Sequence, residues 1–150
     1  GLARHRHPPV AADLRRALDQ IQRMAEFFRS RVRSFQYAFA GWWYVLRTQR
    51  NAWIHALASV LVLLLAWWLR LPVRDWAVLF VTMGMVWMAE FMNTALESVV
   101  DLASPQIHPL AKAGKDVGAA AVLIAALCAA VVGFLILGPP LWQRLLQIFH

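Results

Sequence analysis

The chain has little of what small disulfide-rich, zinc-binding or loop-based nucleotide-binding domains depend on. Only one of its 150 residues is a cysteine, Cys128, so a disulfide framework is excluded. No pair of histidines has the spacing of a zinc site, so zinc is not expected. The phosphate-binding loops GxxxxGK(S/T) and GxGxxG are also absent. Any nucleotide site in this chain must therefore be built in another way.

Charged residues are scarce, at 15% of the chain, whereas 61% of the residues are hydrophobic. A soluble domain is usually nearer half apolar. Crossing a hydrocarbon core of about 30 Å takes roughly 17–25 helical residues. Three apolar runs meet or nearly meet this length: Trp53–Leu69, Trp76–Val100 and Val117–Leu137. The sequence therefore predicts an all-α membrane protein with three transmembrane helices, and its eight tryptophans are typical of anchors at the membrane surface.

The charge is distributed unevenly along the chain. Residues 1–52 contain ten arginines and three acidic residues, which accounts for the whole formal charge of +7. Under the positive-inside rule, this excess predicts a cytoplasmic N-terminus and an external loop at residues 70–75. The loop at residues 101–116 then lies on the cytoplasmic side. No cleavable signal peptide is expected.

The basic N-terminal part is predicted to form an amphipathic helix on the membrane surface. From Asp13, the expected N-cap, apolar residues recur every three or four positions and arginines lie elsewhere. An anionic lipid surface explains both the arginines and the aromatic residues, so nucleic-acid binding is not expected. We divide the chain into a basic extension at residues 1–30 and a three-span domain at residues 31–150. A bend or close contact is expected at Gly41, and residues 138–140 (GPP) are expected to end the third span before a last short helix.

Four polar residues lie inside or at the end of the second apolar run: Glu90, Asn93, Glu97 and Asp101. On a helix they fall at about 0°, 300°, 340° and 20°, which places them on one stripe about 16 Å long. An acidic residue at membrane depth costs at least ~2.5 kcal/mol on insertion scales. The stripe therefore indicates a function, such as binding a cation, moving a proton or holding a polar head group.

A second polar cluster follows at the next cytoplasmic turn: His108, Lys112, Lys115 and Asp116. Lys115 and Asp116 are expected in the first turn of the third spanning helix or at its cap, where free N–H groups and the helix dipole attract anions. The stripe thus offers carboxylates for a divalent cation, and this cluster offers a basic helix start for phosphate. The pairing suits Mg²⁺–nucleotide chemistry.

The two clusters together resemble the signature of a known family. AEFMNTALESVVDL followed by HPLAKAGKDVGAAAVLI has the form E-x-x-N-(S/T)-A-(I/L)-E-x-x-V-D, then H-x(6)-K-D. This is similar to the small bacterial integral-membrane lipid kinases, the prokaryotic diacylglycerol kinase and undecaprenol kinase family. The stretch SFQYAFAGWWYVLRTQRNAWIH also resembles the family's SFxxAxxG…RNxxIH region, so the likeness covers roughly residues 33–138.

The resemblance implies a homotrimer of three-span subunits in the bacterial plasma membrane, with composite sites between neighbouring subunits. Members use Mg²⁺ and transfer the γ-phosphate of ATP to a lipid hydroxyl at the membrane interface. By position, Glu90 matches the proposed general base and Glu97 a Mg²⁺-coordinating carboxylate. Asn51 and His55 fall in the region that lines the lipid head-group site. The residues that match nucleotide-contacting positions are Tyr37, Asn93, Asp101, His108, Lys115 and Asp116.

The chain departs from the family at Gln49, in TQRN, where the family has a glutamate, in ERN, as its second metal-binding carboxylate. Glutamine keeps a carbonyl oxygen but has no charge, so weaker Mg²⁺ binding is expected. Three explanations stay open. The enzyme is active with weaker metal binding, with Asp116 or Asp101 as a compensating ligand; the residue was substituted to trap a complex; or the chain has lost catalysis and serves as a structural or assembly subunit of a larger membrane complex.

The main prediction is a lipid kinase that acts on undecaprenol or diacylglycerol at the cytoplasmic membrane interface. The stretch HPLAK-x-x-KDV resembles the undecaprenol branch of the family more closely. A proton-coupled transporter would also use intramembrane acidic residues. It leaves the cluster from His108 to Asp116 unexplained, and so does not account for the whole pattern.

Overall fold

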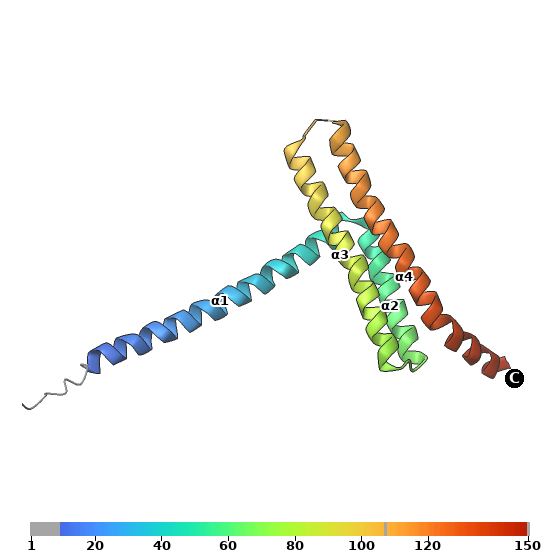
Figure 1. Cartoon of the computed structure of the whole chain (residues 1–150), viewed down its shortest axis with the longest axis horizontal. Coiled ribbons are helices and arrows are strands. Elements are labelled where there is room, and N and C mark those ends of the chain that lie inside the picture. Colours follow the sequence, from blue (N-terminus) through green and yellow to red (C-terminus); the bar gives the residue numbers. More distant parts are fainter. Residues whose placement is uncertain (1–9, 107, 150) are drawn as a thin grey trace, which may run out of the picture. The chain divides into compact units, whose positions relative to one another are not determined.

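The computed structural model describes residues 10–106 and 108–149, with the side chains of residues 14–106 and 108–148. Every regular element in these ranges is a helix: α1 (Val10–Thr48), α2 (Arg50–Trp68), α3 (Val73–Ala103) and α4 (Pro109–Phe149) (Figure 1). The last three are long and apolar enough to cross a membrane. The prediction of an all-α protein with three spans is therefore confirmed.

The chain forms two compact units, Gly1–Trp43 and Tyr44–His150. In the first unit, α1 already includes Asp13, so the predicted N-cap there is wrong; Ala11 and Ala12 before it are strong helix formers that extend the helix. The helix also continues through Gly41, where an added Cβ would meet nothing within 4 Å. The predicted close contact at Gly41 is therefore wrong within the described residues, and the helix does not end there, because a single glycine weakens a helix without ending it.

The second unit is a bundle of α2, α3 and α4, which lie side by side in Figure 1. Helix α3 packs mainly against α4. The apolar core lies toward the turn between α2 and α3, and it centres on Ala66, Leu79 and Leu137. Most of the other large apolar side chains are exposed. Exposed apolar surface on this scale is typical of helices that face lipid or another subunit.

Helix α4 differs from the sequence prediction at its C-terminal end. It runs without a break through Pro139 and Pro140 to Phe149, so the predicted end of the third span at residues 138–140 is wrong. Proline fixes φ near −65°, which is a helical value, although each proline removes one backbone donor. Gly138 also lacks the Cβ that clashes with a following proline ring. The helix therefore loses backbone hydrogen bonds at the two prolines but stays helical.

Helix α3 is longer than a bilayer core is thick. Its 31 residues span about 46 Å at 1.5 Å per residue, compared with about 30 Å of hydrocarbon. The hairpin that α3 forms with α4 extends beyond the start of α2 (Figure 1). This geometry places the C-terminal turns of α3, which carry the polar stripe, at one end of the bundle.

Candidate active site

The four polar residues of α3 pass from a buried to an exposed environment along the helix. Glu90 is only 1% exposed and Asn93 8%, whereas Glu97 is half-buried and Asp101 is exposed. A buried acidic residue needs partners, because burying an unpaired charge is costly. The stripe faces such partners on the neighbouring segments of the bundle.

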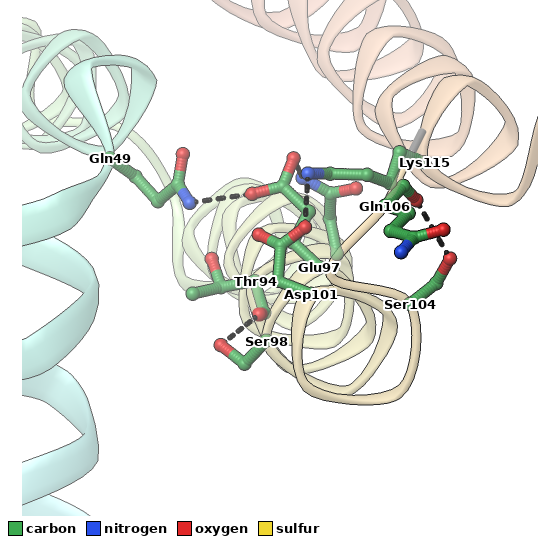
Figure 2. A network of polar contacts seen from close by, with 9 residues as sticks. Gln49, Thr94, Glu97, Ser98, Asp101, Ser104, Gln106 and Lys115 are labelled. Carbon is green, nitrogen blue, oxygen red and sulfur yellow. Dashed lines mark hydrogen bonds and ion pairs between the residues drawn. The ribbon is translucent and has the colours of Figure 1, made fainter. Parts of the chain in front are cut away.

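Glu97 receives two hydrogen bonds from amide side chains. Gln49 Nε2 donates to Glu97 Oε2 at 2.8 Å, and Asn93 Nδ2 donates to Glu97 Oε1 at 3.2 Å. Figure 2 shows Gln49 reaching across to Glu97 from a different segment of the chain. Gln49 can do so because it lies in the extended break between α1 and α2, where φ is −106° and ψ is 117°. The two residues that were predicted to hold metal are thus brought together.

Asn93 is held against the backbone of α4. Its Oδ1 is buried and accepts no hydrogen bond within the described residues. A Cβ at Gly118 would lie 2.3 Å from this oxygen, far inside van der Waals contact. Glycine is therefore the residue that fits at position 118, because it leaves room for the Asn93 amide that donates to Glu97.

A pocket of about 400 Å³ lies beyond Glu97, between the end of α3 and the start of α4. Four of the predicted nucleotide-contacting residues line it: Asp101, His108, Lys115 and Asp116. Lys115 Nζ lies 2.8 Å from Asp101 Oδ1, an ion pair visible in Figure 2. Lys112 also lines the pocket and pairs with Asp116. The pocket is therefore bordered by two lysines, each neutralised by one carboxylate.

The start of α4 corrects one prediction about this pocket. The helix begins at Pro109, so Lys115 and Asp116 lie in its second turn rather than in its first turn or cap. Proline is favoured at the first helical position because its missing N–H is not needed there. His108 caps the helix, since its Nδ1 accepts a hydrogen bond from the Leu110 backbone N–H at 3.2 Å. The free N–H groups of α4 are thus closer to His108 than to Lys115.

Glu90 and His55 face each other inside the bundle. His55 Nε2 lies 3.8 Å from Glu90 Oε2, which is an ion pair only when the imidazole is protonated. His55 also borders an apolar pocket of about 290 Å³ between α2, α3 and α4. Asn51 is exposed in the first turn of α2 and does not line that pocket. Tyr37 belongs to the first unit, so its place near a nucleotide stays a prediction.

The donor set suits a magnesium ion that arrives with a nucleotide better than a resident metal. Among the residues that the structure describes, no group of three or more His, Cys, Asp or Glu side chains is arranged to hold a metal. Mg²⁺ usually keeps several waters and takes one or two carboxylates together with substrate phosphates. Glu97 supplies one carboxylate, and rotation of the Gln49 amide would supply one neutral oxygen. These two ligands fit an ion whose other ligands are phosphate and water.

Comparison with known proteins finds relatives that belong to the family whose signature the sequence resembles. Residues 36–137 match the family model described as prokaryotic diacylglycerol kinase. The chain is 37% identical over 123 residues to the undecaprenol kinase of Bacillus subtilis (strain 168), which covers 82% of this chain and 97% of that protein. It is 50% identical over 109 residues to the diacylglycerol kinase of Synechocystis sp., which covers 72% of this chain and 62% of that protein. It is 33% identical over 95 residues to the diacylglycerol kinase of Escherichia coli (strain K12), which covers 59% of this chain and 78% of that protein.

Three spanning helices with acidic and amide side chains gathered at one end define a small multi-pass membrane protein with a polar site. The chain belongs to the prokaryotic diacylglycerol kinase family, as its signature predicted. Membership of this family makes it a membrane lipid kinase. These relatives lend no support to the alternative of a non-catalytic structural subunit.

Proposed function

We propose that this chain transfers the γ-phosphate of Mg·ATP to the hydroxyl of a lipid alcohol, undecaprenol or diacylglycerol, at the cytoplasmic membrane interface. The observation that carries the proposal is the arrangement at the end of α3. Glu97, held by Gln49 and Asn93, lies one helical turn before Asp101, which lines the lysine-bordered pocket. A carboxylate for metal and cations for phosphate therefore lie side by side.

The nucleotide is proposed to bind in the pocket between α3 and α4. Lys115 would exchange its partner Asp101 for phosphate oxygens, which bind an ammonium group strongly. Asp116 and His108 border the same pocket and would position the rest of the nucleotide. Glu97 and the Gln49 amide oxygen would hold Mg²⁺, which when bound neutralises charge on the phosphates. Asn93 keeps the Glu97 carboxylate in place through its hydrogen bond.

The lipid hydroxyl is proposed to approach from the side of Glu90. This residue lies two turns before Glu97 on the same face of α3, at about 10 Å along the helix axis. A buried carboxylate within reach of a hydroxyl can accept its proton as a general base. The apolar pocket beside His55 would take part of the lipid chain, and Asn51 lies nearer the surface for the head group.

The surroundings of the site are proposed from charge and exposure. Residues 14–44 of α1 are exposed and mix apolar with basic side chains, as expected for a helix that lies on an anionic membrane surface. The arginine excess before α2 favours a cytoplasmic N-terminus in a plasma membrane. The homotrimer with composite sites that the family resemblance implies would cover part of the exposed apolar faces of α2–α4, and in it Tyr37 would approach a nucleotide.

The test is transfer of radiolabelled phosphate from ATP by detergent-purified protein, with undecaprenol and diacylglycerol offered in parallel and Mg²⁺ present or omitted. Mg²⁺-dependent labelling of one lipid is expected, and it would name the substrate. The Glu90→Gln variant should lower kcat by about 10²–10⁴-fold, the usual contribution of a general base. Asp75→Asn, in the first turn of the same helix, is the matched control and should keep full activity. Equal turnover by Glu90→Gln and the unaltered protein would contradict the assignment of the base.

A further inference from the structure

The turn between α2 and α3 has an unusual residue at its central position. The backbone N–H groups of Arg70 and Leu71 donate to Trp67 O and Ala66 O, both at 3.1 Å. These two hydrogen bonds form a Schellman motif, in which one residue adopts a left-handed conformation and is most often glycine. Here that residue is Arg70, with φ of 54°, the only non-glycine residue with positive φ among the described residues. A side chain kept where glycine is favoured points to a use for that side chain.

Arg70 borders a pocket that also contains Arg144 of α4. The pocket has a volume of about 540 Å³ and is lined by Trp67, Trp68, Arg70, Leu71, Trp76 and Arg144. The guanidinium of Arg144 lies 5.7 Å from the centre of the Trp68 ring, within range of a cation–π contact. Neither arginine forms an ion pair within the described part of the chain. Two guanidinium groups from distant segments thus share one tryptophan-lined pocket, and no carboxylate of the described residues pairs with either.

The chemistry of this pocket matches the head group of an anionic phospholipid. Guanidinium groups bind phosphate oxygens through paired N–H donors. Tryptophan rings prefer the level of the membrane where head groups meet acyl chains. The pocket lies at the end of the bundle opposite Glu97, since Trp76 and Glu97 are separated by about 30 Å along α3. Under the proposed topology this is the outer surface, where arginines work against the charge rule and therefore need another reason.

We propose that Arg70 and Arg144 form a binding site for the phosphate of an anionic phospholipid, with the three tryptophans packing against its glycerol and upper acyl chain. The site is separate from the proposed phosphoryl-transfer site, and binding at this end does not require catalysis. Loss of lipid binding at this site is therefore expected to leave phosphoryl transfer at the other end unaffected.

The experiment compares lipid bound to the purified protein from mixed bilayers of phosphatidylglycerol and phosphatidylcholine with identical acyl chains, quantified by mass spectrometry. Preference for phosphatidylglycerol is expected to fall about fivefold for each guanidinium removed, in Arg70→Gly and in Arg144→Gln. The matched control is Arg74→Gln, which removes the same charge near the same turn but does not line the pocket, and it should keep the preference. Unchanged preference in both pocket variants, or an equal loss in Arg74→Gln, would overturn the proposal.

Arg70→Gly also separates a binding role from a structural one. Glycine suits the left-handed position, so this variant is expected to unfold at the same or a higher temperature while losing lipid preference. Retained preference in a stabilised Arg70→Gly protein would show that Arg70 acts only in the turn. Adding excess glycerol phosphate distinguishes the two phosphate sources. No displacement of lipid is expected, whereas full displacement would assign the pocket to a soluble phosphate and overturn the lipid assignment.

Discussion

The two ends of the α2–α4 bundle use opposite chemistry within one small structure. The end near the α2–α3 turn has the apolar core around Ala66, Leu79 and Leu137. The other end buries Glu90 and Asn93, and there Gln49 donates a hydrogen bond to Glu97. An apolar core tolerates substitutions that keep the volume of the side chain. A buried polar group is instead costly as soon as one of its hydrogen-bond partners is removed. We therefore expect substitutions at the first end to act mainly on stability, and substitutions at the second end to act mainly on the proposed chemistry.

The largest expected effect is the loss of activity when the polar end is disrupted. Glu97→Gln removes the one charge that Gln49 and Asn93 both contact, while it keeps the side-chain shape. Loss of a metal-binding carboxylate removes several kcal/mol of charge stabilisation, so activity should fall more than about 100-fold. Mg²⁺-dependent lipid phosphorylation measures this effect. A variant with normal turnover would show that the carboxylate is only structural.

The next effect is a loss of stability when the apolar end is disrupted. Leu79 is 2% exposed and packs in the core with Ala66 and Leu137. Leu79→Ala leaves a cavity and should lower the free energy of unfolding by about 2–4 kcal/mol. The KM for ATP should stay unchanged, because the pocket between α3 and α4 lies at the other end. Unfolding in detergent and steady-state kinetics test both parts, and a raised KM would show that the two ends are coupled.

A smaller effect is expected when two glycines of α4, Gly118 and Gly114, are each replaced by alanine. Gly118→Ala places a Cβ against Asn93 Oδ1 and should displace the amide that donates to Glu97. We expect a loss of about 1–3 kcal/mol in stability, as for overpacking elsewhere, together with reduced kcat. Gly114→Ala is the matched control, because among the described residues an added Cβ there would meet no atom within 4 Å beyond the neighbouring backbone of its own helix. It should leave activity intact and stabilise the helix by about 0.5–1 kcal/mol.

The smallest effect concerns the outer rim of the polar end. Lys112 and Asp116 form an exposed pair at i, i+4, and such pairs contribute at most about 1 kcal/mol. Lys112→Gln should therefore leave the unfolding midpoint almost unchanged. Lys115→Gln should instead raise the KM for ATP, because Lys115 is the proposed phosphate ligand. Equal effects of the two variants on KM would remove the distinction between the lysines.

The spans and the polar stripe could be predicted because they depend on local periodicity. Apolar length sets the three spanning helices, and the spacing of Glu90, Asn93, Glu97 and Asp101 places them on one face. The pairing of Gln49 with Glu97 was not predictable from spacing, since 48 residues separate them. It depends on how the break before α2 directs one side chain toward α3. The contact of Asn93 with Gly118 likewise exists only after α3 and α4 have packed.

Helix ends were predicted less well than helix faces. The sequence signals at Asp13 and at Pro139 and Pro140 were interpreted as boundaries, yet α1 and α4 continue through them. Capping and proline signals change the free energy of a helix end by only a few kcal/mol. Neighbouring helix-forming residues outweigh them, as Ala11 and Ala12 do before Asp13. At Arg70 the error has the opposite sign. Its backbone is left-handed, but the sequence has no glycine there that would have predicted this conformation.

The most direct test of the polar end as a Mg·ATP site is the Mg²⁺ dependence of lipid phosphorylation in Gln49→Glu. The substitution replaces an amide donor 2.8 Å from Glu97 by a second carboxylate, so the unliganded protein should become less stable through repulsion between the two charges. With Mg·ATP, a second charged ligand should lower the Mg²⁺ concentration for half-maximal activity about tenfold or more. Unchanged Mg²⁺ dependence, with intact folding, would contradict a metal site between residues 49 and 97.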